Sequence, residues 1–417
     1  MSAYLTVHKA SELVGVSSDT IRRWDRLGII KSKRSNKNYR LFSIKGLEIV
    51  KSKKNGNSGK YGYRILKEKK KSTYKTIELF TGAGGTALGL ENAGLTNTMV
   101  VEINKDAVAT LKRNRPKWNI IHDDIKNISF KGLEADIIEG GFPCQAFSYA
   151  GKGKGFEDTR GTLFFEFARV IKEIKPLIAI GENVRGLVRH DSGKTLETMV
   201  NVLKELGYRV SYKVLRSQYL DVPQKRERLI LIGVRDDLDI PILFPKETDY
   251  IITIKEALKN VPESEGQIYP ERKKGIMELI PPGGYWKDLP INIQKDYMGA
   301  SFYMGGGKTG MARRLAWDEP SLTLTTSPAQ KQTERCHPAE TRPLKVREYA
   351  RIQTFPDEWV FEGSIASQYK QIGNAVPPNL GYHIGKAIIE MLDKGYEYDK
   401  ELFEEHHISY SKQGRLL

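Results

Sequence analysis

The sequence predicts an α/β protein with a Rossmann-like core, a smaller irregular lobe and a small N-terminal winged helix-turn-helix domain. From Thr76 onward, short apolar runs alternate with amphipathic helical patterns, which is typical of a mostly parallel sheet covered by helices. After about residue 236 this alternation gives way to irregular sequence rich in proline and glycine. The first 75 residues differ again, because they hold 20 Lys and Arg but only 5 Asp and Glu. A length of 417 residues suits two or three domains of this kind.

Residues 1–50 have the pattern of two short helices joined by a tight turn at Gly15. The positions expected to face inward are Val7, Ala10 and Leu13 in the first helix and Ile21 and Trp24 in the second. Gly28 is expected to end the second helix, and a strand is expected at Tyr39 to Phe42. This unit resembles the winged helix-turn-helix of MerR and excisionase proteins over about 45 residues.

Three arginines of the second helix, Arg22, Arg23 and Arg26, are expected on its exposed side as DNA contacts. Residues 51–75 hold ten Lys and Arg against one acidic residue, and we expect a flexible basic linker there. Cations gathered in this way bind nucleic acid by releasing the counterions condensed on phosphates. The alternative is a solvated, solubilising N-terminal segment.

The net charge of +16 is almost wholly N-terminal, and the rest of the chain is nearly neutral. Two cysteines are too few for a disulfide framework, which favours a reducing compartment. No charged-then-apolar leader opens the chain, and no apolar run reaches the roughly 18–20 residues that a spanning helix needs. We therefore expect a protein of the prokaryotic cytoplasm that associates with DNA and not with a membrane.

The catalytic domain is expected at residues 76–235 and to be completed by residues 368–395. Its predicted strands are Thr76–Phe80, Thr98–Glu102, Asp136–Glu139, Leu177–Gly181, Arg209–Leu215 and Leu229–Val234. Helical periodicity returns at residues 343–353 and 380–392. We expect a recognition lobe at residues 236–367 and a C-terminal tail at residues 396–417.

A glycine-rich turn follows the first predicted strand, where Phe80 leads into Gly82 and Gly84 before a helix begins. Such a turn lets the backbone approach a ligand closely at a helix N-terminus. Glu102 follows Gly82 by 20 residues at the end of the next strand, where a carboxylate can bind ribose hydroxyls. Asp124 and Ile125 follow another strand end and suit an adenine. On spacing alone, these residues fit NAD as well as S-adenosylmethionine.

A thiol and a carboxylate follow two further strands. Cys144 lies between Pro143 and Gln145, near the expected start of a helix, which favours its thiolate. Glu182 follows the apolar run of residues 177–180, where burial would raise its pKa. Carbon 5 of cytosine becomes nucleophilic only after a nucleophile adds at carbon 6 with N3 protonated, and this pair suits that chemistry. The alternative for Cys144 is a buried structural thiol.

Polar residues alternate just before the last predicted strand, at Gln224, Arg226 and Arg228. Alternation places them on one side of an extended segment, where a guanidinium can meet cytosine O2 and nearby phosphates. Ordinary surface arginines are the alternative interpretation.

The ordered motifs resemble those of the DNA cytosine-5 methyltransferase family, over about residues 76–392. Those motifs are FTGAGG at 80–85, GFPCQ at 141–145, ENV at 182–184, QKRER at 224–228, RPL with RE at 342–348, and GNAVPP at 373–378. The resemblance implies an S-adenosylmethionine-dependent methyltransferase fold whose last motif packs beside the first.

By this resemblance, the cofactor site is lined by Phe80, Glu102, Asp124 and Asn374. Cys144 attacks the base, Glu182 contacts N3 and Arg228 contacts O2, while Pro143 and Gln145 belong to the substrate loop. The family also implies that the lobe between the eighth and ninth motifs reads the target sequence.

The lobe contains GGGKT at residues 305–309, which is not a phosphate-binding loop because Phe302 occupies the position of its first glycine. We expect Arg313 and Arg314 to contact phosphate or guanine. Cys336 and His337 have no accompanying ligand cluster, and we expect no metal site.

The first functional hypothesis is a DNA methyltransferase that acts as a monomer on double-stranded DNA and is paired with a restriction endonuclease. A second hypothesis is methylation of transfer RNA, because a related branch of the family has similar motifs. The helix-turn-helix and the long lobe argue against RNA. A third hypothesis is a regulator built on an inactive scaffold, and the intact Cys144, Glu182, Arg226 and Arg228 argue against it.

Overall fold

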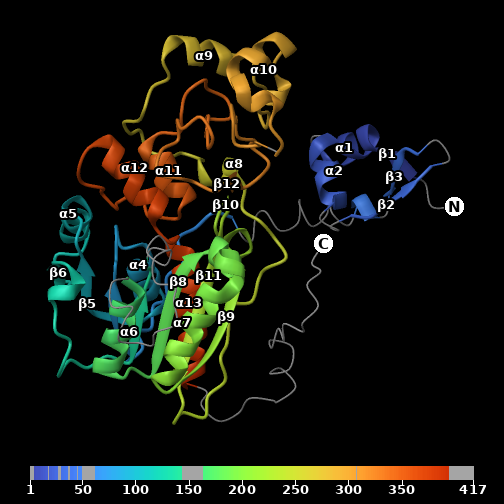
Figure 1. The fold of residues 1–417 in the computed structure, drawn as a ribbon. Coiled ribbons are helices and arrows are strands. Elements are labelled where there is room, and N and C mark those ends of the chain that lie inside the picture. The colour runs from blue at the N-terminus through green and yellow to red at the C-terminus, as the bar shows by residue number, and fades with distance from the viewer. Residues whose placement is uncertain are drawn as a thin grey trace.

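A computed structural model describes the protein at residues 4–16, 18–26, 30–35, 38–44, 46–48, 62–142, 163–306 and 308–393. The side chains of Asp19, Arg23 and Arg26 are not among the features described. The N-terminal unit stands apart in Figure 1, whereas the recognition lobe lies against the catalytic domain. None of the helices in this described part of the chain has the length and apolar character needed to cross a lipid bilayer.

The N-terminal unit is a helix pair with a three-stranded sheet, ordered β1-β3-β2. Its elements are β1 (Tyr4–Thr6), α1 (Val7–Val14), α2 (Ser18–Arg26), β2 (Ser32–Arg34) and β3 (Arg40–Ser43). Ala10 and Ile21 are fully buried in its small core, and Gly15 ends α1 with φ at 68°. Both predicted helices and the predicted strand are therefore confirmed. The sequence analysis missed β1 and β2, which are only three residues long and carry no alternation of their own.

The catalytic domain is built on a seven-stranded sheet with the order β6-β5-β4-β7-β8-β11-β9. Its strands are β4 (Lys75–Leu79), β5 (Thr96–Glu102), β6 (Ile120–His122), β7 (Ile137–Gly140), β8 (Ile178–Val184), β9 (Tyr208–Arg216) and β11 (Glu227–Arg235). All six predicted strands are present within a few residues of the expected bounds. The sheet is parallel except for β11, which pairs antiparallel with both β8 and β9. The Rossmann-like expectation is confirmed, and the reversal at β11 brings residues 226–228 to the carboxyl edge of the sheet.

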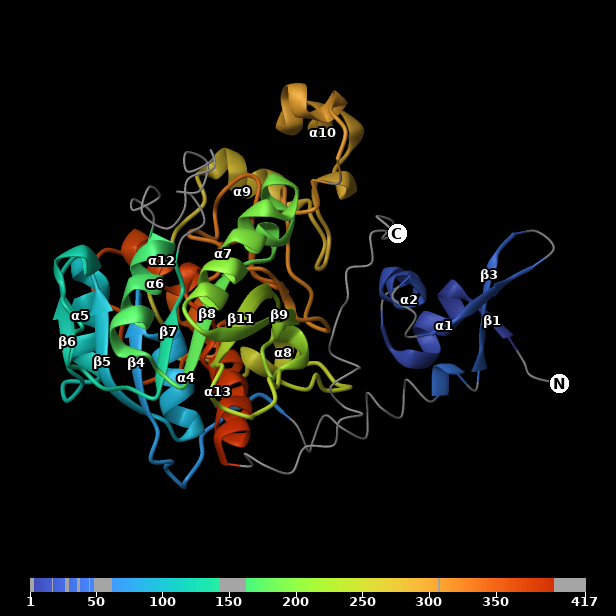
Figure 2. The same cartoon turned by 60° about the horizontal axis from the view of Figure 1, so that its bottom comes forward.

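Helices cover both faces of the sheet (Figure 2). On one face, α6 (Leu163–Ile174) and α7 (Lys194–Glu205) pack on a core that includes Ile138 and Leu229. On the other face, α4 (Gly85–Ala93) and α13 (Pro378–Asp393) lie against each other. The helix α5 (Lys105–Asn114) follows β5 near the sheet edge.

The C-terminal segment returns to the first glycine turn, as the family resemblance implies. A Cβ atom added to Gly85 would lie 2.1 Å from the carbonyl oxygen of Val376. One at Gly89 would lie 2.6 Å from the Cα atom of Gly381. Glycine is therefore required along α4 so that α13 can approach its backbone, and the last motif is part of the catalytic domain.

The recognition lobe is mostly irregular, as predicted, but it has a core of its own. Its elements are α8 (Ile254–Ala257), α9 (Glu271–Glu278), α10 (Ile291–Met298), α11 (Val346–Ile352) and α12 (Ile365–Asn374). Met277, Trp286 and Cys336 are buried in the core of the outer part of the lobe, whereas α8, α11 and α12 share a core with Leu88 and Leu111 of the catalytic domain. The two-residue strand β12 (Ser321–Leu322) pairs with β10 (Gln224–Lys225) and so joins the lobe to the segment before β11.

The predicted flexible linker of residues 51–75 is too long at its C-terminal end. Residues 62–74 run along α13, where the Asn379 side chain accepts a hydrogen bond from the Leu66 amide at 3.0 Å and donates one to the Arg64 carbonyl at 2.9 Å. The Tyr63 hydroxyl donates to the Arg351 carbonyl. These partners are about 300 residues away in sequence, and the local abundance of lysine gave no sign of them.

Removing residues 1–61 is expected to leave the thermal unfolding midpoint of the catalytic domain unchanged, whereas removing residues 1–74 lowers it. The second truncation removes the Leu66 amide and the Arg64 carbonyl that pair with the buried Asn379 side chain, which then keeps only its bond to the Asp221 carbonyl, and each unpaired buried polar group costs about 1–3 kcal/mol. Calorimetry of the two truncations and of Asn379→Ala in the full chain measures the difference. Equal midpoints for the two truncations would show that residues 62–74 do not stabilise the domain.

Candidate active site

The glycine turn stands at the carboxyl end of β4 and opens α4. Phe80, Gly82 and Gly84 all have positive φ, at 58°, 55° and 84°. A Cβ atom at Gly84 would lie 2.7 Å from the Leu111 side chain. The N-cap residue of α4 is Gly84, which has no side chain to bond to the N–H groups of the first turn.

Glu102 fixes this turn to the end of β5. Its carboxylate accepts hydrogen bonds from the Gly82 amide at 2.6 Å and from the Asn104 amide at 2.7 Å. Asp124 caps a short 3-10 turn by accepting from the Lys126 amide at 3.1 Å, and Ile125 beside it is buried. Asn374 is exposed at the end of α12, within the segment that returns to the turn. The structure thus places these residues at one edge of the sheet.

Glu182 and Arg228 form an ion pair at the same edge, with 2.7 Å between Oε1 and Nε. The antiparallel register of β8 and β11 sets Arg228 opposite Val184, two residues past Glu182. Burial raises the pKa of Glu182, and the guanidinium groups of Arg228 and Arg226 oppose that rise. A Cβ atom at Gly141 would lie 3.2 Å from Glu182 Oε2, so the chain that leads to Cys144 passes directly beside this carboxyl group.

Asn183 is a residue whose role the sequence analysis missed. Its side-chain amide donates to the Phe142 carbonyl at 2.8 Å and ties the end of β8 to the chain after β7. Phe142 also packs against Phe164 and Phe167 of α6. The signal was present in the sequence, because Asn183 is the central residue of the triplet that contains Glu182. The predicted Pro143, Cys144 and Gln145 lie outside the described residues.

Arg226 differs from the prediction of a catalytic role. It is 1% exposed, and its guanidinium donates to the carbonyl oxygens of Leu324 at 3.2 Å, Gly373 at 3.0 Å and Ala375 at 2.9 Å. Gln224 is also fully buried and bonds to Gln353 rather than facing a substrate. The partners of these two side chains, which are Gln353, Leu324 and residues 373–375, enclose two of the three predicted polar residues. The structure favours a structural role for both residues.

Arg314 lies inside the recognition lobe. Its guanidinium donates to the Met277 carbonyl at 2.7 Å and to the Thr341 hydroxyl at 2.8 Å. These contacts favour a structural role over the predicted contact with DNA. Arg313 is half-buried, with its guanidinium 5.8 Å from the ring centroid of Tyr285.

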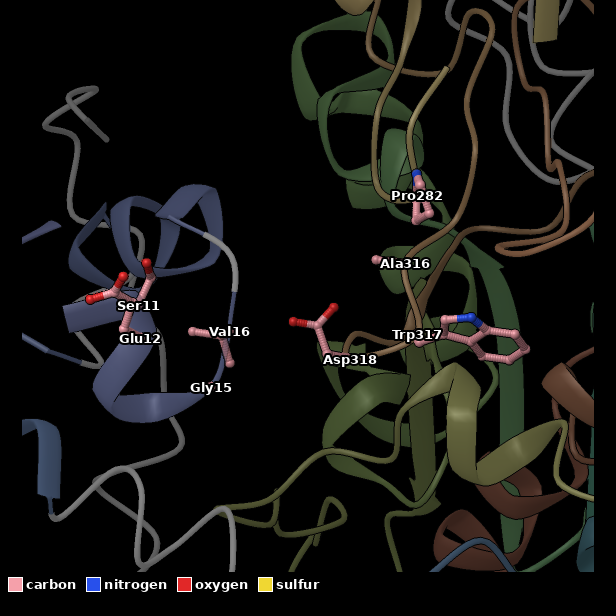
Figure 3. Close-up of a pocket in the computed structure, with 8 residues that line it drawn as sticks. All are labelled: Ser11, Glu12, Gly15, Val16, Pro282, Ala316, Trp317 and Asp318. Atoms are coloured by element: carbon pink, nitrogen blue, oxygen red, sulfur yellow. The ribbon is translucent and has the colours of Figure 1, made fainter. Parts of the chain in front are cut away.

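In the N-terminal unit, Arg22 is exposed on α2 as predicted, and the side chains of Arg23 and Arg26 lie outside the described residues. An open groove runs between this unit and the recognition lobe, with Gly15 and Val16 on one side and Trp317 and Asp318 on the other (Figure 3). Glu12 and Asp318 make its lining acidic, which is unfavourable for a phosphate backbone.

The fold and this edge define a Rossmann-type enzyme that combines a glycine turn suited to a nucleotide-like cofactor with a buried carboxyl–guanidinium pair. The chain belongs to the C-5 cytosine-specific DNA methylase family, whose model matches residues 74–390. It is a DNA cytosine-5-methyltransferase of the type II, restriction-modification kind. The MerR family regulatory protein model matches residues 6–42.

Relatives of the chain are bacterial type II methyltransferases. M.Eco47II of Escherichia coli is 54% identical over 406 residues, which are 93% of this chain and 96% of that protein. M.Sau96I of Staphylococcus aureus is 53% identical and covers 82% of this chain and 83% of its own length. Both carry the type II name that the family match leads one to expect.

Solved structures agree with the fold. A prophage-encoded protein of E. coli, described as a DNA modification methyltransferase, has a TM-score of 0.56 at 25% identity and covers 77% of this chain and all of its own. A DNMT2 mutant of Spodoptera frugiperda has a TM-score of 0.52 at 19% identity, with 76% of this chain and all of its own covered. The second likeness shows the fold alone.

Arg226→Ala is expected to lower the free energy of unfolding by about 2–4 kcal/mol, because several buried carbonyl groups lose their donor. Arg228→Ala, two residues further along, is the comparison: it should lose methyl transfer, and Glu182 can take up a proton when its partner is gone, which limits the loss of stability. Urea denaturation and a methylation assay on both variants measure the contrast. Wild-type stability with lost turnover in Arg226→Ala would instead place Arg226 on the substrate.

Proposed function

We propose that the protein methylates carbon 5 of cytosine within a short specific sequence of duplex DNA, with S-adenosylmethionine as the donor. The reaction would pass through a covalent bond between Cys144 and carbon 6 of a base turned out of the helix. The observation that supports this best is the Glu182–Arg228 pair, because it stands beside the glycine turn and beside the chain that leads to Cys144.

Cys144, Glu182 and Arg228 would each have a different chemical role. The Cys144 thiolate adds to carbon 6, and the electron pair of the 5,6 double bond moves to carbon 5 as N3 is protonated or hydrogen-bonded. Glu182 supplies that hydrogen bond, which its raised pKa supports. Arg228 is within reach of the same base and would pair with O2. After the methyl group is attached, a base removes the carbon 5 proton, and the bond to Cys144 breaks.

The residues of the turn fit S-adenosylmethionine. Gly82 and Gly84 shape a turn that lets a ligand approach the N-terminus of α4, and a Cβ atom at Gly82 would meet no atom within 4 Å. Glu102 would take the ribose hydroxyls, Asp124 and Ile125 the adenine, and Phe80 and Asn374 the remaining wall. When bound, the cofactor supplies an electrophilic methyl group.

DNA is the substrate that the family match and the type II relatives support. The paired restriction endonuclease and action as a monomer are further parts of this proposal. The recognition lobe would read the target sequence, with Arg313 as one of its contacts. A base inside a duplex cannot reach a buried thiol, so the target cytosine must leave the helix.

The N-terminal unit would add DNA affinity or repress the gene of the enzyme. The match to MerR regulatory proteins over residues 6–42 supports both alternatives. Arg22 and Tyr39 are exposed, and Lys33 lies 3.4 Å above the ring of Tyr4 on the adjoining sheet. A basic, aromatic surface of this kind suits a phosphate backbone.

Duplex DNA with 5-fluorocytosine in the target is expected to become trapped on the protein when S-adenosylmethionine is present. Fluorine at carbon 5 cannot leave as a cation, so the adduct with Cys144 persists through denaturing electrophoresis. A mismatch opposite the target should speed capture, because it removes part of the few kcal/mol, roughly, that unpairing costs.

Two controls make the trap decisive. Cys144→Ser should abolish methyl transfer and the adduct while leaving cofactor binding largely intact, since a hydroxyl lacks the nucleophilicity of a thiolate. An adduct that persists in Cys144→Ala would overturn the assignment of the nucleophile. Fluorinated transfer RNA tests the alternative substrate, and an RNA adduct without a DNA adduct would overturn the proposal of DNA.

Removal of residues 1–61 is expected to leave sequence-specific methylation in place and to weaken DNA binding. Each lost phosphate contact reduces the slope of log affinity against log salt by about 0.9. Titration of the target duplex at several salt concentrations gives the slope for both proteins. An unchanged slope would show that the N-terminal unit does not touch this DNA.

A further inference from the structure

Two carboxyl groups lie buried in the sheet behind Glu182. Glu78 of β4 and Glu139 of β7 are register partners in parallel strands, and they are 1% and 2% exposed. Glu139 is in turn the register partner of Ile180 in β8, and Glu182 follows two residues later. Side chains at register partners and at every second residue share one face of a sheet. The three glutamates therefore form a row across three neighbouring strands.

The surroundings of this row favour the protonated form of its inner members. Burial raises the pKa of Glu139 well above its ordinary value, and the neighbouring carboxylates of Glu78 and Glu182 raise it further. Burial raises the pKa of Glu78 as well, although the Ala87 amide at the start of α4 opposes this. The Oε2 atom of Glu78 has no hydrogen-bond partner among the described residues. Neither glutamate has a salt bridge to a cation in that part of the chain.

The two arginines near this row of glutamates do not pair with Glu78 or Glu139. Arg228 pairs with Glu182, and Arg226 donates to main-chain carbonyls. This arrangement creates a conflict for catalysis. Glu182 must carry a proton when it meets N3, but a guanidinium at 2.7 Å favours its ionised form. Burial outweighs this effect and leaves the pKa of Glu182 raised, so a change at Arg228 would shift the proton between Glu182 and the neighbouring carboxyl group of Glu139.

We propose that Glu139 stores this proton and passes it to Glu182 when Arg228 turns from Glu182 to the cytosine. The inference rests on the proposed role of Glu182 and deepens it. An O–H bond on Glu139 breaks and an O–H bond on the Glu182 carboxylate forms, so one proton and one negative charge exchange places. The charge of the pair does not change, and release of the product reverses the exchange. Glu139 is a positioning residue for the proton, because Glu182 alone touches the base.

Glu139→Gln is expected to change the pH profile and not only the rate. Gln keeps the shape of the side chain but carries no proton that can be passed on. Glu182 then loses its proton at lower pH, and the basic limb of kcat/KM moves to lower pH by about one unit, which is a tenfold difference on that limb. At the acid end of the profile, the variant should approach the wild type. Glu139→Asp should restore part of the shift.

Glu78→Gln is the matched control. It removes a carboxyl group from the same face, one strand further from Glu182, and its amide oxygen can still accept from the Ala87 amide. A smaller shift in the same direction is expected. Two outcomes would overturn the inference. One is a loss of kcat/KM in Glu139→Gln that is equal at every pH, and the other is a shift of the basic limb in Glu78→Gln as large as that in Glu139→Gln.

Failure of the inference can be told apart from failure of the proposed function. Glu182→Gln with wild-type turnover would remove the role of Glu182 itself. An inactive Glu182→Gln together with a pH-independent effect of Glu139→Gln would remove only the role of Glu139.

Unfolding gives a readout that does not depend on activity. The folded state binds the Glu139 proton more tightly than the unfolded state, whose pKa is near 4.5, so the wild type loses stability as pH rises above that value. Glu139→Gln has no such proton. Its unfolding midpoint relative to the wild type should therefore rise steadily from about pH 4.5 upward. A difference between the two midpoints that is constant with pH would show that the pKa of Glu139 is not raised.

Discussion

The ion pair between Glu182 and Arg228 is the interaction on which the rest of the site depends. It exists because β11 runs against its neighbours, which sets Arg228 beside the end of β8 rather than at the far edge of the sheet. The pair is largely removed from water, so neither charge is screened by solvent as a surface pair would be. A carboxyl group in this position is poised between two protonation states, because burial favours the neutral form and the guanidinium favours the ion. Under the proposed mechanism, a base that competes for Arg228 would shift that balance toward the neutral form.

The same segment also holds the catalytic domain and the recognition lobe together. Arg226 donates to carbonyl groups of Leu324 in the lobe and of residues 373–375 at the C-terminal end of α12. The segment 373–378 continues into α13, which lies against α4 so closely that glycine is required there. A residue two positions before Arg228 thus braces the turn, the lobe and the returning helix against one another. These hydrogen bonds add to the hydrophobic core that the lobe shares with the catalytic domain, and together they attach a mostly irregular lobe to the domain that holds the site.

The local patterns of the sequence were sufficient for much of the fold. Apolar runs located all six predicted strands, and the glycine turn with Glu102 located the edge where the site stands, because these signals lie within a few residues of each other. The hydrogen-bond partners of several polar side chains, in contrast, are distant in sequence. Arg226, Gln224 and Arg314 look like surface or substrate groups in sequence, yet their partners lie about 25 to 150 residues away. The partners of residues 62–74 are more distant still, which is why a lysine-rich stretch was taken for a linker.

The buried carboxyl groups show most clearly that the sequence alone does not reveal which strands become neighbours. Glu78 and Glu139 sit in apolar runs that predicted strands correctly, and nothing in either run indicates that the two would become neighbours. Only the parallel pairing of β4 with β7 brings them together, and only the pairing of β7 with β8 adds Glu182 to the row. A charged side chain in such a position costs several kcal/mol, roughly, unless it is neutralised, so a lone buried glutamate would be expected to be replaced by an apolar residue. Two of them lie behind Glu182, which gains and loses a proton in the mechanism proposed above, so a use for the proton explains them better than packing does.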